Sequence, residues 1–201
     1  MMMSKRINLI IILILIISAS SCRDVAVPRP KGYFRIDLPE KKYLTFNKDK
    51  ESKNTLPLSF EYPVYGQLKF QGDNPNKEGW FNIEFPEYKA KIYLTYRDIK
   101  NDLDTLLEQT YKLNVRNHIT KADAINEQFI NNEDNKVYGI FYDLKGNTAS
   151  AVQFYITDSL KHYLRGSLYF AAEPDKDSLA PVIEFFRQDV MHLIETLEWK
   201  K

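Results

Sequence analysis

The most constraining feature of this chain is a long apolar stripe near its end. Eight apolar residues recur there at helical spacing: Leu179, Val182, Ile183, Phe186, Val190, Leu193, Ile194 and Leu197. Ser178 is the expected N-cap of this helix, and Pro181 falls in the expected first turn, where a missing N–H costs nothing. A stripe this wide needs a sheet face to cover it, which predicts a helix packed on a β-sheet.

The segments before this helix show the period-two alternation of β-strands. Strands are expected at 58–63, 64–70, 80–85, 89–96, 137–144, 149–157 and 162–171, with a short one around 129–130. Asn101 is the expected cap of a first helix, whose buried stripe would be Leu103, Leu106, Leu107 and Tyr111. These patterns predict an α+β fold, with an antiparallel sheet packed against two main helices.

The first residues have the pattern of a lipoprotein signal peptide. Lys5 and Arg6 precede an apolar run over residues 7–17, too short to span a bilayer. Small residues then lead to Cys22, the one cysteine of the chain, although Ala19 stands where a lipobox usually has Leu. We therefore expect removal of residues 1–21 and lipidation of Cys22; the alternative is a secreted protein with a free thiol.

Charge divides the rest of the chain into two parts. Residues 22–55 hold nine Lys or Arg and five Asp or Glu, whereas 56–201 hold 17 and 22, so the nets are +4 and −5. We expect 22–55 to be a basic arm, either a solvated tether near anionic lipid or partly docked through the apolar segment 33–39. Residues 56–201 are expected to form a single domain. The balanced total, 28 basic against 27 acidic residues, argues against nucleic-acid binding.

Few residues suggest catalysis or metal binding. His118, His162 and His192 sit in different predicted elements, outside any metal-binding spacing, and a single cysteine excludes a Cys-rich zinc site. Asp158, Ser159 and His162 contain the residue types of a hydrolase, but they occupy a predicted tight turn, which is the preferred interpretation. No cofactor motif is present, so we predict a protein that is not an enzyme. The acidic residues Glu127, Glu133 and Asp134 are better explained by a solvated loop than by a carboxylate pair.

One sheet face is rich in tyrosine. A binding platform for a small ligand or glycan would use Trp80 together with Tyr138, Tyr142, Tyr155, Tyr163 and Tyr169. The same residues would serve equally as amphipathic packing residues between the sheet and a helix. The pattern leaves both interpretations open.

Several strings together resemble the gliding motility lipoprotein GldD family of Bacteroidetes. They are KGYFRIDLP at 31–39, FEYP at 60–63, WFNI at 80–83, KADAI at 121–125, VYG at 137–139, KGN at 145–147, QF at 153–154, TDS at 157–159, LRGSLYF at 164–170 and EWK at 198–200. The order of elements is also similar to Mog1/PsbP-type α/β sandwiches. The resemblance implies an envelope lipoprotein needed for gliding and linked to type IX secretion; it transfers no catalytic residue, and only Cys22 as the lipidation site.

We therefore expect a lipid-anchored, non-catalytic accessory or scaffold protein with other envelope proteins as partners. Residues 23–25 include no acidic run, which favours the periplasmic face of the envelope. The alternative is an envelope lipoprotein that binds a ligand or glycan on the tyrosine-rich face. A hydrolase centred on Ser159 and His162 is the least favoured hypothesis.

The substitution Cys22→Ala tests the anchor. Without the thiol no acyl chain is attached, so the variant is expected in the soluble fraction after cell fractionation, whereas the natural chain pellets with membranes. A variant that still pellets and resists a salt wash would contradict the lipoprotein assignment.

Overall fold

The computed structural model describes residues 36–47, 56–71, 79–173 and 175–200. The chain divides into two units, residues 1–34 and 35–201, and every described residue belongs to the second. The predicted signal peptide and Cys22 lie outside the described residues. No helix in the described part is both long and apolar enough to cross a membrane.

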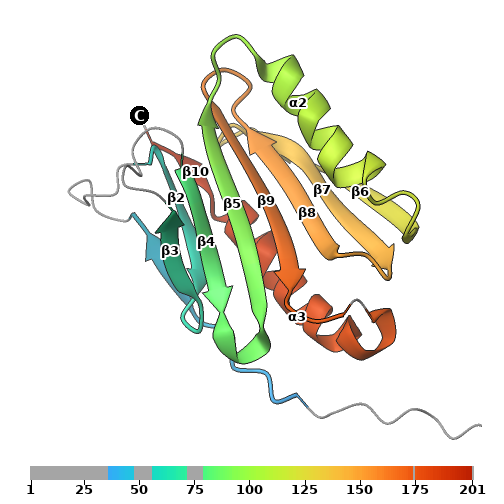
Figure 1. The fold of residues 1–201 in the computed structure, drawn as a ribbon. Helices are drawn as coiled ribbons and strands as arrows, with labels where there is room; N and C mark the ends of the chain where they lie inside the picture. The colour runs from blue at the N-terminus through green and yellow to red at the C-terminus, as the bar shows by residue number, and fades with distance from the viewer. Residues whose placement is uncertain (1–35, 48–55, 72–78, 174, 201) are drawn as a thin grey trace, which may run out of the picture. The chain divides into compact units, whose positions relative to one another are not determined.

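The main element is a seven-stranded sheet in which all neighbouring strands are antiparallel (Figure 1). Its order is β3-β4-β5-β9-β8-β7-β6, so β5 pairs with β9, which comes much later in the chain. The bounds are β3 Gln67–Gln71, β4 Gly79–Phe85, β5 Ala90–Asp98, β6 Ala122–Asn132, β7 Val137–Gly146, β8 Ser150–Thr157 and β9 His162–Phe170. The predicted strands are confirmed, although β6 is longer than the short strand expected around 129–130.

Helix α3, Lys176–Glu195, covers one face of this sheet. Phe186 is fully buried, and its ring contacts the rings of Phe85 and Phe170, with centroids 4.5 and 6.1 Å away. The predicted stripe is confirmed, because its buried members are Val182, Phe186, Val190, Leu193, Ile194 and Leu197. The apolar face of the sheet and the apolar face of α3 thus form one core.

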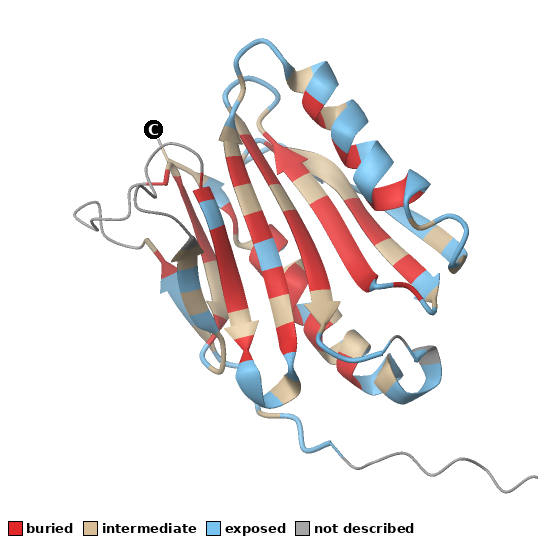
Figure 2. Ribbon diagram, in the orientation of Figure 1, coloured by how far each residue is buried: buried red, intermediate tan, exposed pale blue. Residues whose placement is uncertain are grey.

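A small second sheet covers the rest of the same face. It has the order β1-β2-β10, with β1 Tyr43–Phe46, β2 Leu58–Pro63 and β10 Glu198–Trp199. Phe46 and Phe60 pack on Phe81 of β4, with ring centroids 6.2 and 6.1 Å apart. Figure 2 shows the buried residues concentrated along the central strands of the large sheet. The fold class is therefore α+β, as the sequence predicts.

Strand β1 lies inside the segment predicted to be a basic arm. Just before it, Lys41 donates to the buried carboxylate of Asp189 on α3, at 2.6 Å. Tyr43 and Tyr65 donate to the same carboxylate at 3.0 and 2.6 Å, and burial raises the pKa of both hydroxyls. Through three donors, Asp189 therefore joins α3 to β1 with its preceding residues and to the turn between β2 and β3.

The apolar segment 33–39, expected to dock in part, lies only partly within the described residues. Residues 33–35 lie outside the described part, and Ile36 and Leu38 are exposed. Tyr88 donates to the carbonyl oxygen of Asp37 at 3.2 Å. Within the described residues, this part of the chain is attached through the charged contact of Lys41 and the pairing of β1 with β2.

Both helix starts differ from the prediction. The cap of α3 is Asp175, whose carboxylate accepts from the N–H groups of Asp177 and Ser178, so Pro181 is the sixth helical residue rather than part of the first turn. Helix α2, Leu103–Tyr111, has Asp102 as its N-cap, while Asn101 has a left-handed backbone with φ of 60°. A nearby carboxylate replaces Ser178 because it accepts two N–H groups at once.

The substitution Leu193→Ala measures how much of the core rests on α3. Leu193 is 1% exposed, so its truncation leaves a cavity and is expected to lower the free energy of unfolding by about 2–5 kcal/mol. Leu160→Ala is the matched control, because Leu160 is 73% exposed and its loss is expected to change little. Chemical denaturation checks both; equal small effects would mean that the α3 stripe is not core.

Candidate functional site

The other face of the large sheet, which we call the outer face, is mostly polar along β5, β8 and β9 and carries a small apolar cluster with Ile140 and Leu144 on β7. Its side chains on the central strands are Lys91, Tyr93, Thr95, Tyr142, Gln153, Tyr155, Tyr163, Arg165, Ser167 and Tyr169, which alternate with the core residues along β5, β7, β8 and β9. Helix α2 and the π-helical segment η2, Lys112–Arg116, lie against this face. The rest of the outer face is left open.

Helix α2 contacts the outer face through polar side chains more than through its predicted apolar stripe. Its buried residues are Leu106 and Thr110, and those of η2 are Asn114 and Val115. Thr110 Oγ1 hydrogen-bonds the hydroxyl of Tyr163. Tyr111, predicted to be buried, is 45% exposed. The predicted stripe is therefore confirmed at Leu106 and wrong at Tyr111. The sheet beneath presents Tyr163 and Arg165, which hydrogen-bond Thr110 and Asn114.

The tyrosine-rich face is divided between packing and exposure. Tyr142 and Tyr163 are buried, at 2% and 3%, and Tyr155 stacks on Tyr163 with centroids 5.9 Å apart. Tyr169 instead meets the exposed Tyr93 edge-to-face at 5.5 Å. The five tyrosines therefore do not form one open platform; Tyr169 and Tyr93 are the pair that faces the open part.

A buried polar network links η2 to the sheet. The guanidinium of Arg165 donates from Nε and Nη2 to Asn114 Oδ1 at 3.1 and 3.0 Å, and from Nη2 to Gln153 Oε1 at 3.1 Å. Gln153 Nε2 lies 3.0 Å from His118 Nε2. Asn114 and Gln153 are both fully buried. A cation is thus held inside the protein by two neutral amides.

Two members of the network, Arg165 and His118, have lowered pKa values. Burial lowers the pKa of Arg165 below its ordinary value, although a guanidinium remains protonated in proteins. Burial, with the charge of Arg165 and of Lys121, also lowers the pKa of His118, which favours its neutral form. Among the described residues, the hydrogen bonds of Arg165 go to neutral amides, so this half-buried guanidinium keeps its positive charge without a carboxylate partner.

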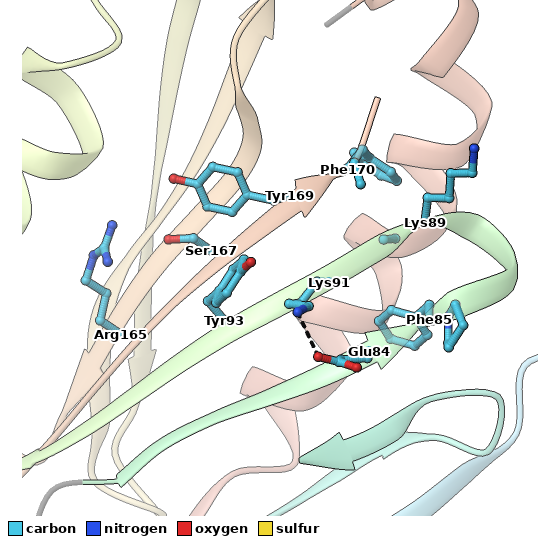
Figure 3. A pocket seen from close by; sticks show the side chains of 12 residues that line it. Glu84, Phe85, Lys89, Lys91, Tyr93, Arg165, Ser167, Tyr169 and Phe170 are labelled. Carbon is cyan, nitrogen blue, oxygen red and sulfur yellow. Dashed lines mark ion pairs between the residues drawn. The ribbon is translucent and has the colours of Figure 1, made fainter. Parts of the chain in front are cut away.

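A cavity of about 810 Å³ opens on the outer face next to this network. It is lined on one side by Arg165 and Ser167, and on the other by Lys91 and Glu84, which form an ion pair of 2.7 Å. Figure 3 shows Tyr93, Ser167 and Tyr169 lying between Arg165 and that ion pair. Its volume is in the range of small-molecule sites.

A smaller cavity, about 200 Å³, lies between α2 and the sheet. Trp80, which is 52% exposed, lines it together with Thr110, Tyr163 and Arg165. Arg165 lines both cavities, so its guanidinium stands at their junction. The sequence analysis singled out Trp80 but missed Arg165, Asn114 and Gln153, because they come from three separate elements and no spacing connects them.

The residues considered for hydrolysis have other partners. Asp158 Oδ1 accepts from the N–H groups of Leu160, Lys161 and His162, at 3.0, 2.8 and 2.8 Å, which is turn chemistry. His162 Nδ1 is 2.7 Å from the hydroxyl of Tyr96, and its ring stacks on Trp199. Ser159 has a left-handed backbone with φ of 66°. Asp158 thus stabilises the turn, and His162 is oriented by Tyr96 rather than by a carboxylate.

The other residues considered for catalysis or metal binding lie in separate parts of the fold. His192 stacks on Tyr43 with centroids 3.7 Å apart and contacts Glu61 at 2.7 Å, between α3 and the small sheet. Glu127 lies on β6, whereas Glu133 and Asp134 lie in the following turn. Within the described ranges, no three His, Cys, Asp or Glu side chains gather closely enough to hold a metal ion.

The substitution His118→Gln is expected to weaken the loss of stability in acid. The folded-state pKa of His118 is lowered, so the unfolded chain binds more protons there, and stability falls as pH drops below the ordinary value of about 6.5. Denaturant unfolding at pH of about 7.5 and 5.5 should show a smaller loss in the variant than in the natural chain. Some loss should remain, because burial lowers the pKa of His162 as well. Equal losses in the two proteins would contradict a neutral, buried His118.

Comparison with known proteins supports one assignment. The family model described as gliding motility lipoprotein GldD matches residues 23–199. No curated protein matches the chain. The solution structure of cyanobacterial PsbP (CyanoP) from Synechocystis sp. PCC 6803 is similar at 12% identity and a TM-score of 0.45, over 83% of this chain and 97% of that chain. Because the family match extends over most of its length, this chain belongs to the gliding motility lipoprotein GldD family.

Proposed function

We propose that this protein is a lipid-anchored, non-catalytic accessory or scaffold protein of the gliding machinery, linked to type IX secretion. The single observation that carries the proposal is the family match over residues 23–199, which begins directly after Cys22. Its partners are other envelope proteins of gliding and secretion. Its place is the cell envelope, anchored by lipid and facing the periplasm.

The distribution of charge supports a role at a membrane surface. The segment 22–55 carries a net charge of +4 directly after the anchor, and anionic lipid attracts basic residues of this kind. Part of that segment, Lys41 and strand β1, is attached to the domain through Asp189. This attachment begins close in sequence to Cys22, which supports a role of the domain near the membrane.

The contacts of the residues considered for hydrolysis support a non-catalytic role. Asp158 binds backbone N–H groups, and His162 pairs with Tyr96 and Trp199. A nucleophile needs an adjacent base within hydrogen-bond reach, and no described hydrogen bond joins Ser159 to His162. The protein would then act by holding other molecules.

A second candidate function, binding of a small ligand, is favoured by the cavity on the outer face. Tyr93, Tyr169, Ser167 and Arg165 converge there, which is the composition of a recognition site rather than of a packed core. This candidate replaces the five-tyrosine platform expected from the sequence. It is compatible with a scaffold role.

Deletion of the gene tests the proposed function. We expect the deletion strain to stop gliding and to export fewer proteins by type IX secretion, with both restored by the natural gene on a plasmid. The variant Cys22→Ala should restore them poorly, because it lacks the anchor, while Ser21→Ala is the control that keeps the cysteine beside a small residue. Colony spreading and analysis of the culture medium measure the two phenotypes. Normal gliding and normal export after deletion would contradict the proposal.

A further inference from the structure

The outer face holds a buried donor with no acceptor. Asn114 is fully buried, and its Nδ2 has no hydrogen-bond partner among the described residues. The orientation of the amide is determined, because Arg165 has only donors and both of its hydrogen bonds to Asn114 reach Oδ1. A buried N–H group without an acceptor is costly, so a side chain that presents an oxygen in place of this N–H group would be favoured at position 114.

Arg165 beside it lacks a negative partner. Its described hydrogen bonds go to the amide oxygens of Asn114 and Gln153, both neutral, and use Nε and Nη2. Nη1 takes no part in them, although a guanidinium binds oxyanions best through two nitrogens. A partly buried cation is ordinarily paired, so the absence of a described carboxylate at Arg165 points to an anion supplied by a ligand.

Basic residues outnumber acidic ones around the cavity on the outer face. Three of its lining residues are basic, Lys89, Lys91 and Arg165, and one is acidic, Glu84. That carboxylate is already shared by Lys91 and Lys69, at 2.7 and 2.6 Å, and those contacts lower its pKa. It is therefore not available to neutralise Arg165, and the cavity keeps an excess of positive charge.

Aromatic rings stand beside this charge in a fixed arrangement. Across the sheet, Thr95 pairs with Arg165, Tyr93 with Ser167 and Lys91 with Tyr169. The two rings therefore lie on the same face as Arg165, further along β5 and β9 in the same direction. The rings of Tyr93 and Tyr169 meet edge-to-face at 5.5 Å and 84° (Figure 3). Tyr93 is 42% exposed, so its ring is accessible to a second planar group.

We propose that this part of the outer face binds a small ring-bearing molecule through its oxyanion, a phosphate or a carboxylate. Arg165, which lines the cavity, holds the oxyanion, and Tyr93 and Tyr169 contact the ring. Asn114 lies behind Arg165 and positions its guanidinium through Oδ1. Phosphate and carboxylate share the geometry that a guanidinium recognises, so the experiment distinguishes them. The site is separate from the lipid anchor and stands whether or not the scaffold role is correct.

The decisive variant is Asn114→Asp, which builds the missing anion into the protein. Its carboxylate would pair with Arg165 and remove the unpartnered N–H group, so the thermal unfolding temperature is expected to rise while ligand binding is lost. A structural role alone predicts no such opposite change. A lower unfolding temperature in this variant would overturn the proposal, because it would mean that the position does not lack a negative charge.

Binding is measured by calorimetry on the full-length protein in detergent. The probes are phenyl phosphate, inorganic phosphate and benzoate, with sodium chloride at matched ionic strength as the blank. We expect phenyl phosphate or benzoate to bind, and Arg165→Gln and Asn114→Asp to weaken that binding by at least about tenfold, the loss of a hydrogen bond to a charged group. Arg116→Gln is the matched control, because Arg116 is exposed on the same segment as Asn114 and should leave binding unchanged.

Each outcome decides part of the proposal. Tighter binding of phenyl phosphate than of benzoate identifies the phosphate, and the reverse identifies the carboxylate. Tyr93→Leu keeps an apolar side chain at an exposed position and should weaken the ring-bearing probes while leaving inorganic phosphate unchanged. Equal affinity for phenyl phosphate and inorganic phosphate would overturn the role of the tyrosines. No binding of any probe, or binding unaffected by Arg165→Gln and Asn114→Asp, would overturn the site.

Discussion

The structure depends on the burial of one face of the seven-stranded sheet. Neither α3 nor the small sheet covers that face alone, and together they enclose a single core in which the rings of Phe60, Phe81 and Phe186 are fully buried. Burial of apolar area is the dominant favourable term in folding, so this face determines which segments must meet. It also explains why the end of the predicted arm becomes a strand: Phe46 belongs to the same core.

The outer face of the sheet does not have to pack against this core. Helix α2 covers only part of it, and beneath η2 the hydrogen bonds of Arg165, Asn114 and Gln153 lie beside a small apolar cluster of Val115, Tyr142 and Leu144. Buried polar groups cost free energy unless they are satisfied, so such a network is expected where recognition matters. One sheet thus carries a structural face and a face suited to binding.

The large elements were predictable because their signals are local. Alternation along β5 and the stripe of α3 follow from periods of two and 3.6 residues, which any strand or helix with one buried face must show. The helix starts were predicted wrongly, because Asp175 competes with Ser178 for the same N–H groups and only the backbone decides between them. The buried face of α2 was predicted correctly at Leu106 and wrongly at Tyr111, since the hydroxyl of Tyr163 on the sheet turns Thr110 inward instead.

By itself, the sequence determined the class of the protein: an α+β fold, with a cysteine and a basic segment ahead of it, and the motifs of one family. These features follow from composition, periodicity and short sequence motifs, which do not depend on contacts between distant parts of the chain. Only the tertiary structure decided that Arg165, Asn114 and Gln153 meet, and that Tyr142 and Tyr163 are buried while Tyr93 is open. Those outcomes depend on the order of strands in the sheet and on where α2 crosses it. Neither can be predicted from periodicity, because strands that pair may be far apart in the chain.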